Sequence, residues 1–254
     1  MAKNKKTIIA NWKMNPATLG EAKELFSAIQ SGASNYTDII TVICPPFVYI
    51  EELAKLRNSE SVIMGAQDIF WEESGAFTGE ISGKMLNEFG VEYVLVGHSE
   101  RRSLGETDEM VNKKISAILA AGMRPVLLVG EKERGEYRQD ILIDQLSQDL
   151  SGVSAEDAKK LLLVYEPVWA ISSHSGGISD TLESALEAIK IMREILTKMF
   201  PEVGSAIPIL YGGSVNPETA IGFLSHPEIA GAVVGSASLK PEAFIKILQT
   251  AFQS

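Results

Sequence analysis

Residues 161–165 read Leu-Leu-Leu-Val-Tyr, an apolar run that meets its first charged side chain only at Glu166. A strand with one face in water alternates apolar and polar residues, whereas a strand covered on both faces does not. The run therefore predicts a buried strand with helices on both sides. Such strands are typical of the parallel sheets of α/β proteins.

Seven further runs of this kind occur along the chain, at residues 7–11, 39–44, 62–66, 93–96, 125–129, 209–211 and 232–234. Amphipathic stretches lie between them, most clearly at 17–31, 107–121, 140–150, 181–199 and 241–251. Thr107 and Thr181 supply capping side chains at two helix starts. Eight strands in 254 residues leave about 32 residues per unit, which suits right-handed βα units closing into a (β/α)8 barrel. On the pattern alone, a doubly wound open sheet is the alternative.

The composition predicts one soluble domain over residues 1–254. No linker or low-complexity tract divides the chain, and no apolar run reaches the roughly 18 residues of a membrane span. The net charge of −10, from 33 acidic and 23 basic residues, argues against nucleic acid as a partner. The single cysteine, Cys44, is expected to be a small buried hydrophobe and fits a reducing, cytoplasmic location.

Reactive side chains in a parallel barrel lie where strands end at their carboxyl termini. Those positions hold Asn11 and Lys13 after the first strand, His98 after the fourth and Glu166 after the sixth. Taken singly, each has an ordinary interpretation: a solvated glutamate, a structural histidine or a surface lysine. Together, a carboxylate, an imidazole and an ammonium group at one end of a barrel predict acid–base chemistry on an anionic carbonyl compound. We expect the other two histidines, His174 and His226, to be loop residues.

Glycine-rich turns follow the last two strands, Gly212-Gly213-Ser214 and Gly235-Ser236. Clustered main-chain N–H groups suit a phosphate, and barrels commonly bind phosphate at these two loops. One such turn is a weak signal. Two such turns at the same end of neighbouring strands predict a phosphate site.

Four segments of the chain resemble the signatures of the triose-phosphate isomerase family, in the family's order and spacing. These are residues 10–15 (Ala-Asn-Trp-Lys-Met-Asn), 97–102 (Gly-His-Ser-Glu-Arg-Arg), 165–170 (Tyr-Glu-Pro-Val-Trp-Ala) and 211–215 (Tyr-Gly-Gly-Ser-Val). The resemblance runs nearly end to end. It implies a single TIM barrel and a cytoplasmic enzyme of glycolysis and gluconeogenesis that needs neither a metal nor an organic cofactor.

The resemblance also implies a role for each site residue. Glu166 would be the base that moves a carbon-bound proton through an enediolate, with neutral His98 as the electrophile. Lys13 and Asn11 would hold the substrate oxygens. Glu100 would hold the site residues in place without contacting the substrate itself. The phosphate would bind main-chain N–H groups, those of Ser172, Ser214, Gly235 and Ser236.

A long segment, residues 67–80, resembles the loop that joins two subunits in this family. It carries Phe70, Trp71 and Phe77, and exposed aromatic side chains on so long a loop call for an explanation. The resemblance implies a homodimer in which Thr78 reaches toward the partner's active site. A loop folded onto its own subunit is the alternative.

The chain departs from the family pattern at three places. Residues 172–177 read Ser-Ser-His-Ser-Gly-Gly where the family usually has Gly-Thr-Gly in its mobile lid, which predicts a different closing equilibrium. Ser236 stands where a second glycine is usual, and its hydroxymethyl group would donate a hydrogen bond to the phosphate or crowd it. Leu128 stands where cysteine is frequent. None of these changes removes a reacting group.

Other functions compete with this interpretation. A Schiff-base aldolase would need a lysine where the sixth strand ends in glutamate, and a metal-dependent epimerase would need several converging ligands. A barrel kept as a binding or scaffolding protein is the alternative from a different class. Such a protein would be free to lose Lys13, His98 or Glu166, and all three are present.

Overall fold

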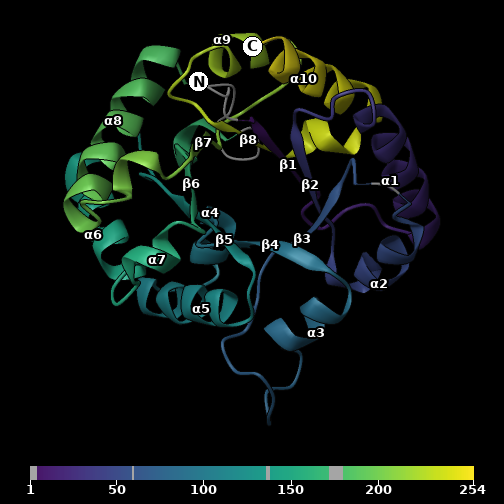
Figure 1. Ribbon diagram of the computed structural model, residues 1–254, viewed down its shortest axis with the longest axis horizontal. Helices are drawn as coiled ribbons and strands as arrows, with labels where there is room; N and C mark the ends of the chain where they lie inside the picture. Colours follow the sequence, from purple (N-terminus) through teal and green to yellow (C-terminus); the bar gives the residue numbers. More distant parts are fainter. Residues whose placement is uncertain (1–4, 59, 136–137, 172–179) are drawn as a thin grey trace.

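The computed structural model describes residues 5–58, 60–135, 138–171 and 180–254. The strands in these ranges form one closed sheet in chain order, each parallel to its neighbours, and β1 pairs with β8 (Figure 1). This closure confirms the barrel and excludes the open doubly wound sheet. The strands are β1 Thr7–Asn11, β2 Ile40–Cys44, β3 Ile63–Ala66, β4 Val91–Val96, β5 Arg124–Val129, β6 Leu162–Tyr165, β7 Ile209–Tyr211 and β8 Gly231–Val234.

Helices surround the barrel (Figure 1). Thr107 and Thr181 cap helices as predicted, accepting hydrogen bonds from the N–H groups of Met110 and Ser184. The α-helices are α1 Leu19–Ala33, α2 Phe47–Leu56, α3 Gly83–Glu88, α4 Ser99–Ser103, α5 Asp108–Ala120, α6 Arg138–Asp149, α7 Ala155–Ala158, α8 Leu182–Met199, α9 Ala220–Leu224 and α10 Pro241–Gln253. Short 3-10 helices are η1 Val168–Ala170, η2 Gly204–Ala206 and η3 Ser236–Leu239.

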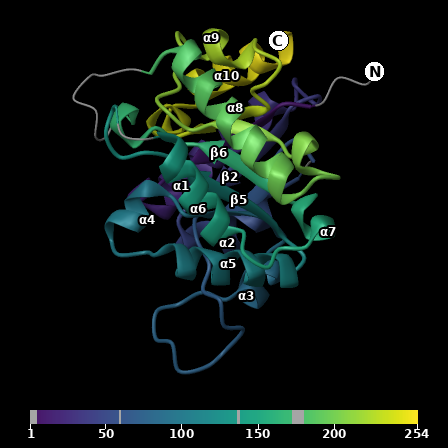
Figure 2. The ribbon, with the colours of Figure 1, turned by 90° about the vertical axis from the view of Figure 1, so that its left-hand side faces the viewer.

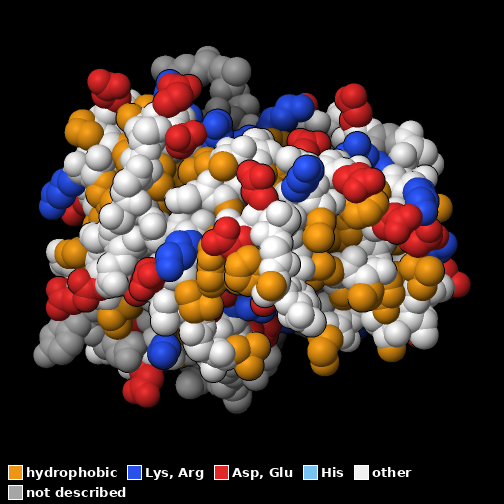
Figure 3. Space-filling view, turned by 90° about the horizontal axis from the view of Figure 1, so that it is seen from below, with side chains coloured by type: hydrophobic (Ala, Val, Ile, Leu, Met, Phe, Trp, Pro, Cys, Tyr) orange, Lys and Arg blue, Asp and Glu red, His pale blue; other side chains and the backbone are white. Residues whose placement is uncertain are grey.

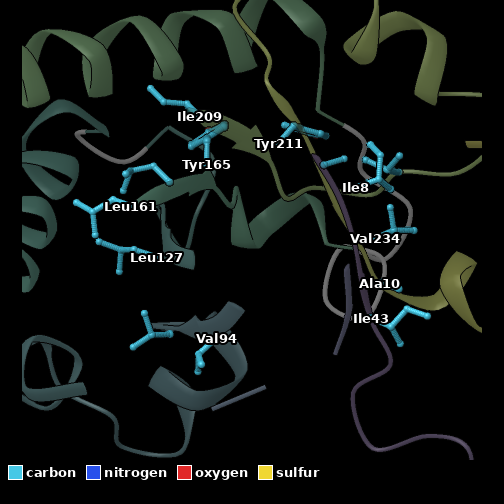
Figure 4. Packing of buried hydrophobic residues seen from close by; sticks show 14 of the residues in the cluster. Ile8, Ala10, Ile43, Val94, Leu127, Leu161, Tyr165, Ile209, Tyr211 and Val234 are labelled. Carbon is cyan, nitrogen blue, oxygen red and sulfur yellow. The ribbon is translucent and has the colours of Figure 1, made fainter. Parts of the chain in front are cut away.

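The core has two layers because successive side chains of a strand point to opposite faces. One layer lies between the strands and the helices and includes Ile8, Leu127 and Tyr165 (Figure 4). The other is a separate cluster that contains Ile9, Leu128 and the other strand residues of the opposite parity. It fills the inside of the barrel. Cys44 belongs to this inner cluster and is fully buried, as predicted.

Closure of the barrel depends on a glycine at the seam between β8 and β1. Gly231 has a φ of +155°, and a Cβ atom there would lie 1.8 Å from the carbonyl oxygen of Thr7. Only a residue without a side chain lets the two backbones approach so closely.

Residues 67–82 form a loop that projects from the barrel beyond α3 (Figures 1 and 2). Figure 3 views the molecule from the side of this loop, and Lys and Arg side chains are scattered there among Asp and Glu rather than gathered in one area. Among the described residues, no helix is both long and apolar enough to cross a membrane.

Candidate active site

The strand parity that builds the core also aims the reactive side chains. Asn11 continues the inward parity of Ile9 on β1, and Glu166 continues that of Val164 on β6. Both are nearly inaccessible to solvent, with exposed fractions of 5% and 3%. The solvated-glutamate interpretation of Glu166 is therefore excluded.

Glu166 and His98 contact each other directly. Nε2 of His98 lies 3.2 Å from Oε1 of Glu166, and the other carboxylate oxygen accepts a hydrogen bond of 2.8 Å from the main-chain N–H of Ser99. Ser99 is the first residue of α4, and its N–H group has no partner within the helix. The carboxylate is thus held by one side chain and one helix terminus.

The protonation of His98 follows from its other nitrogen. Nδ1 accepts a hydrogen bond of 3.1 Å from the main-chain N–H of Glu100, so Nδ1 carries no proton. A neutral ring then carries its proton on Nε2, where it faces Glu166. Two main-chain N–H groups at the start of α4 point toward this pair of side chains. The Glu100 amide donates to the imidazole, whereas the Ser99 amide donates to the carboxylate.

Lys13 is fixed by three contacts at the end of β1. Its main-chain N–H donates to Oδ1 of Asn11 at 3.0 Å, and its carbonyl accepts from Nε2 of Gln67 at 2.9 Å. Its φ of +52° is unusual for a residue with a side chain, and these bonds hold it there. Its ammonium group lies 2.5 Å from Oε1 of Glu100. Glu100 thus contacts Lys13 through its carboxylate and the His98 ring through its main-chain N–H.

The loops after β7 and β8 lie beside these groups. A Cβ atom at Gly235 would be 3.5 Å from Cε of Lys13. Neither Ser214 nor Gly235 donates its main-chain N–H to another residue in the described part of the chain. Ser236 begins η3 and is exposed. Ser172 and the rest of the predicted lid, including His174, lie outside the described residues.

Glu131 is a residue of the site that the sequence analysis missed. It follows β5, and its Oε1 accepts hydrogen bonds from Tyr165 Oη at 2.8 Å, Trp169 Nε1 at 3.0 Å and Arg138 Nε at 3.0 Å. Two of these donors flank Glu166 in the chain. Glu131 therefore fixes the segment that carries the carboxylate, and only its position after a strand could have indicated this.

Gln67 was missed in the same way. It follows β3, and its Nε2 donates to the carbonyl oxygens of Lys13 and Cys44, each at 2.9 Å. It joins the ends of β1 and β2 to its own loop. Within the described ranges, no group of three or more His, Cys, Asp or Glu side chains is arranged to hold a metal ion.

The projecting loop carries Thr78 at its exposed end. Phe70 contacts the rings of Trp71 and Phe77, with centroid distances of 4.1 and 4.8 Å, yet Phe77 remains 42% exposed. The aromatic side chains therefore cluster within the loop and still leave apolar surface in water.

One end of the barrel thus holds a carboxylate, an imidazole, an ammonium group and main-chain N–H groups that have no partner among the described residues. The carboxylate can take a proton from carbon, and the imidazole and ammonium can donate to oxygens on neighbouring carbons. The N–H groups can bind an anion. The arrangement suits proton transfer within a small anionic carbonyl compound.

Comparison with known proteins gives one family. A family model described as "Triosephosphate isomerase" matches residues 6–251. The triosephosphate isomerase of Dictyoglomus thermophilum is 42% identical over 97% of this chain and 99% of its own. That of Aquifex aeolicus is 43% identical over 96% of this chain and 98% of its own. A crystal structure of triosephosphate isomerase from Bartonella henselae superposes with a TM-score of 0.85 at 32% identity, covering 97% and 98% of the two chains.

Proposed function

This chain belongs to the triosephosphate isomerase family, and from that premise we propose that it interconverts D-glyceraldehyde 3-phosphate and dihydroxyacetone phosphate with Glu166 as base and neutral His98 as electrophile. The observation that carries the assignment of roles is the 3.2 Å contact between His98 Nε2 and Glu166 Oε1. It puts a hydrogen-bond donor and a base side by side, as proton transfer between adjacent atoms requires.

The reaction needs the contact between the two residues to open. His98 Nε2 has one proton to donate, and a substrate carbonyl that accepts it displaces the Glu166 carboxylate. The freed carboxylate takes a proton from the carbon next to the carbonyl. The electron pair of that C–H bond forms the C=C bond of an enediolate, whose negative charge lies on the former carbonyl oxygen.

Lys13 and His98 stabilise that charge. The Lys13 ammonium has three donors, and its bond to Glu100 uses one of them. The imidazole moves a proton between the two enediolate oxygens. Glu166 then returns its proton to the neighbouring carbon, so the reaction has no net loss or gain of protons and requires no cofactor. Asn11 helps to hold the substrate oxygens beside Lys13.

The phosphate group binds the loops after β7 and β8. The main-chain N–H groups of Ser214, Gly235 and Ser236 donate to its oxygens, and that of Ser172 adds a further donor from the lid. The support for this step is the pair of N–H groups at Ser214 and Gly235 that have no described partner, one of them beside Lys13.

The proposal is tested by the isomerisation of glyceraldehyde 3-phosphate, measured for the purified protein and for Glu166→Gln. We expect turnover by the native protein and a loss of at least about a thousandfold in the variant. Glu24→Gln is the matched control, because Glu24 is exposed on α1 and far from the barrel interior. A folded native protein without turnover would favour the binding or scaffolding alternative.

The same proposal includes a homodimer. Met14, next to Lys13, is 93% exposed, and Met85 near the projecting loop is 50% exposed. A second subunit that covers these side chains and Phe77 would remove apolar surface from water. Thr78 at the loop end would then reach toward the partner's site. Because Cys44 is buried and forms no disulfide, the proposal also places the enzyme in the reducing cytoplasm.

Molar mass in solution tests the dimer. We expect light scattering to give twice the mass of one chain for the native protein and the mass of one chain for Phe77→Asp. Ile221→Asp on α9 is the control, because Ile221 is 55% exposed on another part of the barrel. A native monomer at micromolar concentration would contradict this part of the proposal.

A further inference from the structure

A largely buried ionic cluster lies next to the turn that carries His98. The Arg102 guanidinium, on α4, donates through Nη2 to Oδ2 of Asp149 at 2.7 Å and through Nη1 to Asp108. Its Nε donates to the carbonyl oxygen of Gly97 at 2.7 Å. One side chain thus joins the end of α6 and the start of α5 to the residue before His98.

The Gly97 turn fits closely against this guanidinium. Gly97 has a φ of +74°, and a Cβ atom there would lie 2.9 Å from Nη2 of Arg102. The main-chain N–H of Arg102 also donates to the carbonyl of His98 at 3.0 Å. Arg102 therefore contacts the carbonyl oxygens of both Gly97 and His98, the first through its side chain and the second through its main-chain N–H.

Asp149 is the more buried of the two acidic partners of Arg102. Its side chain is fully buried, whereas that of Asp108 is 24% exposed. Its Oδ1 accepts no hydrogen bond within the described ranges. Burial raises the pKa of Asp149 to about 8, with Arg102 opposing the rise and Asp108 adding to it. Burying such a group costs stability, and the reaction chemistry makes no direct use of it.

We propose that Asp149 is a positioning residue for His98: its carboxyl group holds Arg102 where Nε fixes the Gly97 carbonyl, and so sets the distance from the imidazole to the reacting atoms. The inference rests on the proposed function, in which His98 donates to the substrate carbonyl. Asp149 itself touches neither the substrate nor His98. Among the described residues, Arg102 and Asp149 make no side-chain hydrogen bond or ion pair with the loops after β7 and β8. We therefore expect loss of the Asp149 carboxyl to affect the proton-transfer step and to leave phosphate binding largely intact.

Steady-state kinetics of Asp149→Ala and Asp149→Asn test the proposal. We expect the Ala variant to lose about tenfold in kcat with KM within twofold of native, since a small displacement of a catalytic group slows the reaction strongly. The Asn variant keeps an oxygen that accepts from Arg102, so it should retain at least half of the native kcat. Leu146→Ala is the control, because Leu146 is fully buried on the same helix and does not contact Arg102 through hydrogen bonds.

Two results would overturn the proposal. One is a folded Asp149→Ala variant with native kcat, and the other is an equal loss of kcat in Leu146→Ala. If Asp149→Ala does not fold, Arg102→Lys gives the same test, because lysine keeps a positive charge but cannot reach both Asp149 and the Gly97 carbonyl. A native kcat in Arg102→Lys would count against the proposal.

An NMR measurement separates this inference from the proposed function. The chain has three histidines, so the His98 ring nitrogens can be assigned by removing the other two in turn. We expect the Nε2 and Nδ1 resonances of His98 to shift in Asp149→Ala and to stay in place in Asp149→Asn and Leu146→Ala. Unchanged His98 resonances in Asp149→Ala would refute the positioning role even if the native protein showed no isomerase activity.

Discussion

Oε2 of Glu166 accepts a hydrogen bond of 2.8 Å from the main-chain N–H of Ser99, the residue that follows His98. Glu166 and His98, the proposed base and electrophile, therefore depend on the same turn at the start of α4. Glu166 accepts a hydrogen bond from the backbone of that turn, and His98 belongs to the turn as its N-cap residue. A displacement of that turn moves both groups together. The geometry of proton transfer thus depends on whatever fixes the turn, including Arg102 and its carboxylate partners.

Replacement of Lys13 by methionine should abolish most of the activity. Methionine has a similar length but no charge, so the developing oxyanion loses a donor, and removal of one such donor costs about a hundredfold or more in kcat. The chain's net charge of −10 makes this local cation important for an anionic substrate. Steady-state kinetics at low and high salt measure both effects.

Lys55→Met is the matched control for Lys13→Met. Lys55 lies on α2, and its ammonium pairs with Glu51 and Glu52 at the surface, where such pairs contribute little. We expect native kinetics. Equal losses in the two variants would show that removing any cation from this acidic protein is harmful, and would contradict a specific role for Lys13.

Replacement of Glu131 by glutamine should lower both stability and activity. An amide group keeps one acceptor oxygen but loses the negative charge opposite Arg138, and its NH2 would fill the place of Oε2, which has no hydrogen-bond partner in the described part of the chain. Leaving a buried donor unsatisfied costs about 1–3 kcal/mol. Urea unfolding and kcat are the measurements.

The control for Glu131→Gln is Glu187→Gln. Glu187 is the other acidic partner of Arg138, at 3.2 Å, but its side chain is 72% exposed. We expect a change in unfolding free energy within about 0.5 kcal/mol, because exposed ion pairs are worth little. If the two variants behave alike, the hydrogen bonds of Glu131 to Tyr165 and Trp169 do not matter.

The strands could be predicted from the sequence to within two residues because each is an apolar run buried on both sides. β6, predicted from Leu161 to Tyr165, begins at Leu162. Several helices gave no comparable signal. α2 begins after Pro46 without a side-chain cap, and α7 and α9 have four and five residues, too few to show a helical period.

The positions of the candidate site residues could be predicted from the fold, whereas their roles came from the family resemblance. Strand ends identified Lys13, His98 and Glu166, and the structure brings these three together. Gln67 directly follows β3, and Glu131 follows β5 after Gly130, but the role of each depends on which carbonyl or side chain it contacts. Those partners come from other strands, and spacing along the chain does not reveal them. The contribution of Asp149 depends on burial in the folded barrel and was likewise hidden.

The pH dependence of stability should change when Asp149 is replaced by asparagine. Burial raises the pKa of Asp149 from 3.8 to about 8, so between these values the folded protein binds a proton that the unfolded chain releases. The stabilisation from this proton is full below the lower value and is lost as pH rises toward 8. Native stability should therefore fall relative to Asp149→Asn by about 1 kcal/mol per pH unit from pH 5 to 8.

Urea unfolding of both proteins at equal concentration from pH 5 to 8 measures this difference. Other titrating groups contribute equally to the two proteins and cancel in the comparison. A difference that stays constant with pH would mean that Asp149 has the same pKa in the folded and unfolded states. Activity is expected to follow the folded fraction in Asp149→Asn, since asparagine resembles the protonated acid.

The seam of the barrel offers a test of closure itself. In Gly231→Ala the added Cβ would meet the Thr7 carbonyl oxygen at 1.8 Å, so β8 must move away from β1 or the chain must remain open. We expect a loss of more than about 3 kcal/mol in the free energy of unfolding, or no folded protein.

The control is Gly222→Ala on α9, where nothing lies within 4 Å of the new atom. Alanine in place of a helical glycine should stabilise the protein by about 0.5–1 kcal/mol. Thermal unfolding compares the two variants directly. A folded Gly231→Ala protein with a native melting temperature would show that the seam between β1 and β8 adapts, and the close approach at Gly231 would then not be required for the barrel.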